Sequence, residues 1–269
     1  MTRVKRAAAF SSHDCPVHES VSLAESRRHG VRAVDVSAPL RWLALGWRDL
    51  MRCPLPGLLH GAALALFGAA LLLLARDRFW LLAGAFSGFL LMAPVLATGL
   101  YAVSRALERG ERPTLGTAMA CWIPRDHRML LFGVLLSAAG TGWVITSASL
   151  ITGWSEVEVR APADFIRHVV LSPSWLFETW LLIGGVLAAP LFASSVVALP
   201  LLLDRPDGVL SAVLTSWRCV MSNPAPLALW ALLIMALTLL GMVTLLLGLV
   251  VVLPWLAHAS WHAYRELVS

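Results

Sequence analysis

Long apolar stretches separated by short polar connections make up most of the chain after residue 57. A helix needs about 20 apolar residues to cross a hydrocarbon core about 30 Å thick, and stretches near this length recur. No segment shows the sustained apolar–polar alternation of a membrane strand. The pattern predicts an all-α, polytopic helical membrane protein with six transmembrane helices, at about 57–75, 79–105, 129–151, 176–203, 225–241 and 243–264.

Two shorter segments have the pattern of amphipathic helices. In the first, Leu43, Trp47 and Leu50 share a helical face, and arginines lie elsewhere around the helix. The second, near residues 210–221, repeats this arrangement. Such helices lie in the membrane interface, with tryptophan and arginine as anchors. The predicted anchors are Trp47, Arg48, Trp217 and Arg218.

Two recurring patterns predict an internal repeat. A Trp-Arg-x-x-Met-x-x-Pro-x-Pro pattern begins at Trp47 and again at Trp217. A Pro-x-x-Ala step occurs three times and predicts helix kinks, because proline removes a backbone donor and clashes with the preceding turn. The prediction is three repeats of an interfacial amphipathic helix plus a kinked two-helix hairpin. We call the interfacial helix of each repeat its lead-in helix, and in the middle repeat only Trp122 marks it. The three kink prolines are Pro94, Pro190 and Pro254.

The segment before the first amphipathic helix is mostly polar and shows no apolar period. We therefore expect residues 1–36 to form a disordered cytoplasmic N-terminal tail. Residues 37–269 form the predicted six-helix transmembrane domain. The apolar block over 225–264 is too long for one crossing, and we expect it to turn near Gly241.

Composition and charge support a membrane location. Hydrophobic residues make up 58% of the chain and charged residues 14%, too few to cover a water-soluble globule. Of the lysines and arginines, 17 fall on one side of the predicted topology and four on the other, which indicates that both termini are cytoplasmic. The net charge of +5 does not indicate nucleic-acid binding, because the arginines flank apolar segments.

His258 and His262 are the candidate cofactor-binding residues, because they lie one helical turn apart. Two imidazoles at this spacing can bind a metal ion or help to hold a haem, but they are also ordinary near a membrane interface. No zinc-protease or haem-attachment motif accompanies them, so no metal or cofactor is assigned. The four cysteines form no CxxC pair and are expected to remain reduced.

Several short stretches together resemble a known family. They are Ala212-Val-Leu-Thr-Ser216, Asn223-Pro224, Trp230-Ala-Leu-Leu-Ile234, Gly248-Leu-Val-Val251 and His258-Ala-Ser-Trp-His-Ala-Tyr-Arg265. They resemble an uncharacterised bacterial integral-membrane family, domain of unknown function 2189, over about 35–267 and most specifically in the last sixty residues. The resemblance implies a bacterial inner-membrane protein and no established reaction.

The function predicted from the sequence is that of a non-enzymatic accessory, assembly or scaffolding protein of the bacterial inner membrane. Its predicted partners are the lipid bilayer and other inner-membrane proteins, with no nucleic acid. One alternative is a passive channel or small-solute transporter, in which the proline kinks open a cavity. A second alternative is a haem- or metal-binding respiratory accessory protein that uses His258 and His262.

Overall fold

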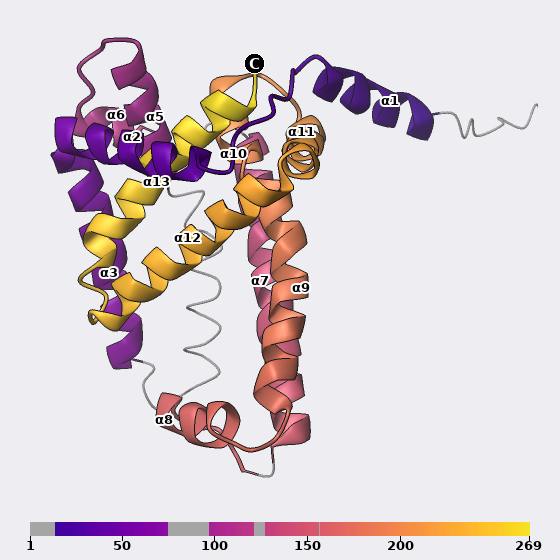
Figure 1. The fold of residues 1–269 in the computed structure, drawn as a ribbon, viewed down its shortest axis with the longest axis vertical. Coiled ribbons are helices and arrows are strands. Elements are labelled where there is room, and N and C mark those ends of the chain that lie inside the picture. The colour runs from indigo at the N-terminus through magenta and orange to yellow at the C-terminus, as the bar shows by residue number, and fades with distance from the viewer. Residues whose placement is uncertain (1–13, 75–96, 121–126, 156) are drawn as a thin grey trace, which may run out of the picture.

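The computed structural model describes residues 14–74, 97–120, 127–155 and 157–269. Most of these residues are helical, and their β-type pairing is limited to one isolated bridge between Val31 and Val268. Figure 1 labels the helices. Their bounds are α1 Asp14–Arg27, α2 Ala38–Arg52, α3 Pro54–Leu74, α5 Thr98–Glu108, α6 Leu115–Met119, α7 His127–Trp154, α8 Pro162–Phe165, the π-helix η1 Ile166–Val170, α9 Leu176–Ser195, α10 Ala198–Asp204, α11 Val209–Ser222, α12 Pro224–Val243 and α13 Leu249–Leu267.

Among the described residues, four helical stretches are long and apolar enough to cross a membrane. They correspond to the predicted first, third, fourth and fifth crossings. The predicted second crossing, 79–105, falls largely outside the described residues, as does Pro94, and the predicted sixth crossing is not among the four. The four stretches are Pro54–Leu73, His127–Trp154, Leu176–Asp204 and Pro224–Val243.

The molecule has two ends, and helices α7 and α9 extend from one to the other (Figure 1). The polar end, as we call it, consists of α2, α5, α10, α11 and the C-terminal half of α13. Helices α7 and α9 run side by side from the polar end to the opposite end, where α8 and η1 connect them. Helix α8 and the π-helix η1 make this connection helical over residues 162–170.

The two predicted amphipathic helices are confirmed as α2 and α11, but α11 is oriented with its polar face inward. Ser211, Thr215 and Ser216 are fully buried, whereas Leu210 and Met221 are exposed. An exposed apolar face next to membrane helices is the arrangement expected of a helix at a lipid interface.

The Trp-Arg-x-x-Met-x-x-Pro-x-Pro pattern folds in the same way at both of its positions. Helix α2 ends just before Cys53 and α11 just before Asn223, and the next helix begins at the following proline. The two break residues have nearly the same backbone angles, φ −140° and ψ 71° at Cys53 and φ −135° and ψ 56° at Asn223. The sequence likeness therefore corresponds to a structural likeness at these two breaks.

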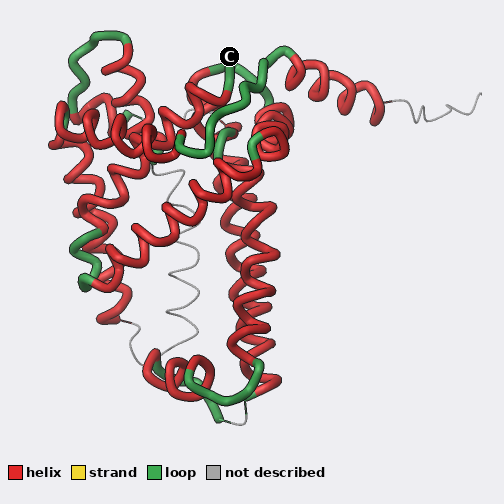
Figure 2. The backbone as a smooth tube through the Cα atoms, in the orientation of Figure 1, coloured by secondary structure: helices red, strands yellow, loops and turns green. Residues whose placement is uncertain are grey.

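The structure differs from the predicted disordered tail over residues 14–36. Residues 14–27 form α1, and the following segment pairs with the C-terminus (Figure 2): Arg32 N donates to Leu267 O at 2.9 Å. Ser26 and His29 are buried. The low hydrophobicity of this segment suggested disorder, but buried polar partners compensate for it.

The other differences concern helix ends within the apolar segments. The connection between α12 and α13 lies at residues 244–248 and not near Gly241 as predicted. Gly241 itself lies within the C-terminal end of α12. Pro190 and Pro254 lie inside α9 and α13. The predicted fourth crossing is interrupted at Val196 and Val197, between α9 and α10.

Candidate functional site

A buried polar cluster lies where α2, α5 and α13 meet. Ser104 Oγ donates to Asp49 Oδ2 at 2.8 Å, and His262 Nε2 donates to the same oxygen at 2.8 Å. Ser104 Oγ also lies 2.8 Å from His258 Nδ1. Because the single Ser104 proton goes to Asp49, the serine oxygen accepts from His258, whose proton is therefore on Nδ1.

This arrangement holds the Asp49 carboxyl in its charged form. Burial raises the pKa of Asp49, whereas the hydrogen bonds from His262 and Ser104 lower it. The nearby imidazoles of His262 and His258 lower it further, so the pKa of Asp49 lies below its usual value.

Serine, histidine and aspartate in contact invite comparison with a nucleophilic triad. In such a triad the serine donates to the histidine, which is oriented by the carboxylate. Here Ser104 donates to Asp49 instead, and both Ser104 and His258 are fully buried. The serine oxygen is neither activated nor accessible, so the cluster has the geometry of a structural network.

The two histidines singled out in the sequence are thus brought together, each with one ring nitrogen bonded within the cluster. His258 Nε2 is buried and has no hydrogen-bond partner among the described residues. In the part of the chain that the structure describes, no group of three or more histidine, cysteine, aspartate or glutamate side chains is placed to hold a metal ion. A haem or metal role for His258 and His262 stays a prediction.

A cavity of about 400 Å³ lies next to this cluster, between α3, α5, α12 and α13. Its polar members are His60, Tyr101, Thr238 and Ser260. His60 is buried, and its Nδ1 lies 3.0 Å from Pro56 O. The remaining lining is apolar: Gly61, Leu64, Ala97, Leu100, Ile234, Met235, Leu239, Met242, Leu253, Pro254, Leu256 and Ala257. The cavity is of the size and character of sites for small apolar molecules.

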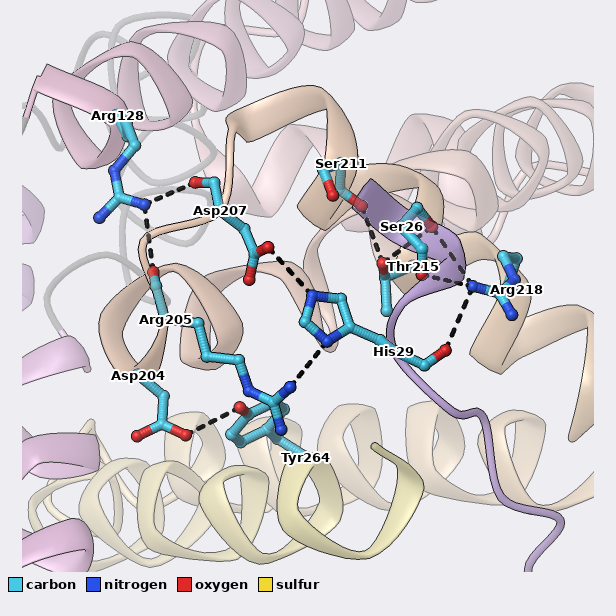
Figure 3. Close-up of polar contacts among 10 residues, drawn as sticks. All are labelled: Ser26, His29, Arg128, Asp204, Arg205, Asp207, Ser211, Thr215, Arg218 and Tyr264. Carbon is cyan, nitrogen blue, oxygen red and sulfur yellow. Dashed lines mark hydrogen bonds and ion pairs between the residues drawn. The ribbon is translucent and has the colours of Figure 1, made fainter. Parts of the chain in front are cut away.

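A second polar cluster joins the N-terminal segment to α10 and α11 (Figure 3). Arg205 Nη1 donates to His29 Nδ1 at 2.7 Å, and His29 Nε2 lies 3.0 Å from Asp207 Oδ1. Arg218 donates to Ser26 O at 2.6 Å. Arg218, predicted to be an interfacial anchor, therefore binds the N-terminal segment.

The other predicted anchors have different surroundings. Trp217 Nε1 donates to Ser194 Oγ of α9 at 2.9 Å. Trp47 is exposed and packs edge-on against Trp255 of α13, with ring centroids 5.3 Å apart. Arg48 is exposed, as expected of an anchor. These positions are compatible with the interface, and the anchoring role itself stays a prediction.

Three residues at matching positions connect successive parts of the chain. Each stands six positions after a tryptophan of a predicted lead-in helix: Cys53 after Trp47, Arg128 after Trp122 and Asn223 after Trp217. Trp122 lies outside the described residues. Each donates to a backbone carbonyl that lies two to six residues before a lead-in helix. Cys53 and Arg128 bond the segment before the next one, and Asn223 bonds the segment before the first. The pairs are Cys53 Sγ to Pro113 O (3.6 Å), Arg128 Nη1 to Asp207 O (2.5 Å) and Asn223 Nδ2 to Arg32 O (3.0 Å).

Sequence reasoning missed Asp49 and Ser104. A signal for Asp49 was present, because it lies on the same helical face as Trp42 and Gly46, both of which are buried. A lone carboxylate on a buried face indicates a polar partner. No comparable signal marks Ser104, whose partners come from distant parts of the chain.

The four helical stretches that are long and apolar enough to cross a membrane indicate an integral membrane protein. The family model described as "Predicted integral membrane protein (DUF2189)" matches residues 81–204, which confirms the resemblance to this family over that stretch. The matched stretch is shorter than predicted and excludes the last sixty residues, where the likeness was expected to be most specific. The comparisons with curated proteins and with solved structures gave no match.

Proposed function

We propose that this protein is a non-enzymatic accessory protein of the bacterial inner membrane that binds an apolar, lipid-like molecule. The observation that carries the proposal is the cavity of about 400 Å³ between α3, α5, α12 and α13. Its apolar lining favours a hydrocarbon chain over a hydrated solute, and so favours binding over the passive channel considered from the sequence.

The position of the cavity supports an amphiphile rather than a bare hydrocarbon. His60, Tyr101 and Ser260 line it from α3, α5 and α13, the helices that also border the buried polar cluster or contribute to it. A lipid whose head group meets these side chains would place its chain along Met235, Leu239 and Met242.

We also propose a location in the inner membrane with both termini in the cytoplasm, and the arginine distribution supports this orientation. The N-terminal segment and the C-terminus are paired at the polar end, so the two lie on one side. That side carries 17 of the 21 lysines and arginines in the predicted topology, which supports a cytoplasmic orientation.

We further propose that the chain consists of three related units arranged in a ring. The bonds from Cys53, Arg128 and Asn223 support this, because each joins one unit to the next. The packing of α5, α10 and α13 against one another supports it too, since these are the ends of the second helix of each unit.

The outward faces of the long helices indicate the remaining partners. Large apolar side chains on α7, α9 and α12 are exposed, and the bilayer or neighbouring membrane proteins would cover them. Among these side chains are Leu131, Val134, Leu135, Ile145, Leu181, Leu182, Val186, Leu232 and Leu240.

A binding measurement with a matched pair of variants tests the proposal. The probe is a pyrene-labelled long-chain fatty acid, titrated into the purified protein in mild detergent. Met235→Trp adds volume at the lining of the cavity, and Leu232→Trp adds the same side chain at a similarly exposed position of α12 that does not line it. We expect saturable binding by the wild type, weakened about tenfold or more in M235W and unchanged in L232W. No saturable binding by the wild type, or equal effects of the two variants, would contradict the proposal.

A further inference from the structure

We infer that α12 and α13 form a re-entrant hairpin. We call residues 244–248 the tip of the hairpin. In this arrangement the tip lies inside the hydrocarbon core and does not reach water on the far side of the membrane. The sequence predicted two complete crossings over the same residues. The inference concerns topology and does not depend on the proposed ligand.

The course of the hairpin carries the first part of the argument. Helix α12 leaves the polar end obliquely to α7 and α9, and α13 returns beside α3 (Figures 1 and 2). The tip lies level with the middle of α9, well short of α8 and η1, which mark the opposite end (Figure 1).

The lengths of the returning helices give the same result. Helix α9 begins 14 residues before Pro190, whereas α13 begins only five residues before Pro254. The difference of nine residues corresponds to ~14 Å of helix at 1.5 Å per residue. That is about half of a ~30 Å hydrocarbon core. Measured from these prolines, which occupy equivalent positions in the proposed repeat, α13 is too short to match the depth that α9 reaches.

The tip also has the chemistry of a segment in lipid. Val243, Leu245 and Leu247 are 80%, 84% and 72% exposed. No aspartate, glutamate, lysine or arginine occurs between Arg218 and Arg265. By contrast, the loop between α7 and α8 contains the exposed ion pair of Glu158 with Arg160. A turn in water would not expose three large apolar side chains without a single charge.

Backbone polar groups in lipid need partners within the protein, because hydrocarbon offers none. Thr244 supplies them at the tip: its hydroxyl donates to Gly241 O and accepts from Gly248 N, both at 2.9 Å. Leu246 N and Leu247 N donate to Met242 O and Thr244 O. The turn is thus closed by its own hydrogen bonds.

Two glycines allow this closure. A Cβ on Gly241 would lie 3.1 Å from Leu249 N, and a Cβ on Gly248 would lie 2.8 Å from Gly241 Cα. The two helices therefore approach each other more closely at the tip than larger residues would permit.

Site-directed spin labelling in liposomes tests the inference. Single cysteines are introduced at Leu245, at Glu158 and at Leu182, which is exposed on the middle of α9, after the native cysteines are replaced by serine. Collision rates are measured with oxygen, which concentrates in hydrocarbon, and with a water-soluble nickel chelate. Leu247→Cys provides a second tip position if Leu245→Cys does not fold.

We expect the tip label to resemble that at Leu182, with frequent oxygen collisions and few chelate collisions. The label at Glu158 should show the reverse and so reports water. A tip label as accessible to the chelate as that at Glu158 would overturn the inference in favour of two complete crossings. A tip label shielded from both reagents would overturn it in favour of a protein partner covering the tip.

Discussion

The backbone of Gly46 in α2 lies directly against that of Ala259 in α13. A Cβ added at Gly46 would lie only 2.5 Å from Ala259 N and 2.8 Å from Ala259 Cα. Helices α2 and α13 form the largest contact between helices in the described structure. This close approach brings Asp49, one turn further along α2, within reach of His262.

Gly46→Ala should destabilise the protein because neither backbone can move without separating the two helices. We expect a loss of about 1–3 kcal/mol, the usual cost of overpacking, measured as a lower midpoint of thermal unfolding in detergent. Gly142→Ala is the matched control, since a Cβ there meets nothing within 4 Å. That variant should be neutral or stabilised by up to ~1 kcal/mol through better helix propensity. Equal effects of the two variants would contradict the close approach.

Asp49→Asn should change how stability depends on pH. The pKa of Asp49 is lowered in the folded protein, so its carboxylate contributes stability at pH values above its unfolded pKa of about 3.9. That contribution is lost as the pH falls through the lower, folded pKa. The stability difference between wild type and D49N should therefore be largest near neutral pH and shrink towards pH 3. Glu111→Gln, at an exposed position, should leave the curve unchanged. A pH-independent difference for D49N would exclude the charged cluster.

Two neighbouring leucines at the tip should respond oppositely to glycine. Leu245 and Leu246 both have positive φ, 55° and 67°, a region that costs a residue with a Cβ about 1–2 kcal/mol. Leu245 is exposed, so Leu245→Gly should raise stability by up to ~1 kcal/mol. Leu246 is buried against Ala65 and Leu249, so Leu246→Gly should lower stability by about 2–5 kcal/mol. Thermal unfolding of both variants checks this, and destabilisation by L245G would contradict the left-handed backbone there.

Cys219 should be inert in the folded protein. It is fully buried, and burial raises the pKa of its thiol to about 12 even though Arg218 lowers it. Because the thiolate is the reactive form, N-ethylmaleimide at neutral pH should not modify Cys219 until the protein is unfolded in SDS. Cys53 is half-buried, and burial raises the pKa of its thiol too. It should therefore react, but more slowly than a free thiol. Rapid modification of Cys219 in the folded state would contradict the burial of the inner face of α11.

Much of the helical architecture could be predicted from local patterns. The helix break at Pro54 and its counterpart at Pro224 follow from proline chemistry and from amphipathic spacing, both of which depend on neighbours in the chain. The turn between α12 and α13 was misplaced because it contains no charge. The glycine at position 241 led us to predict the turn there, but the chain turns at Thr244. The Thr244 hydroxyl bonds the last turn of α12 and the residue before α13.

The candidate site was harder to predict, because its partners are far apart in sequence. Asp49 and His262 are 213 positions apart, and Ser104 and His258 are 154 apart. The spacing of His258 and His262 predicted a shared ligand but did not indicate that each ring bonds a different side chain on another helix. The cavity, too, draws its lining from four helices and has no local signature.

The polar end, where Val31 pairs with Val268, faces the cytoplasm in the proposed topology. Fusions of green fluorescent protein and of alkaline phosphatase after Ser269 test this directly, because the first fluoresces in the cytoplasm and the second is active only in the periplasm. We predict a fluorescent fusion and an inactive phosphatase. An active phosphatase fusion without fluorescence would place the polar end in the periplasm and contradict the account.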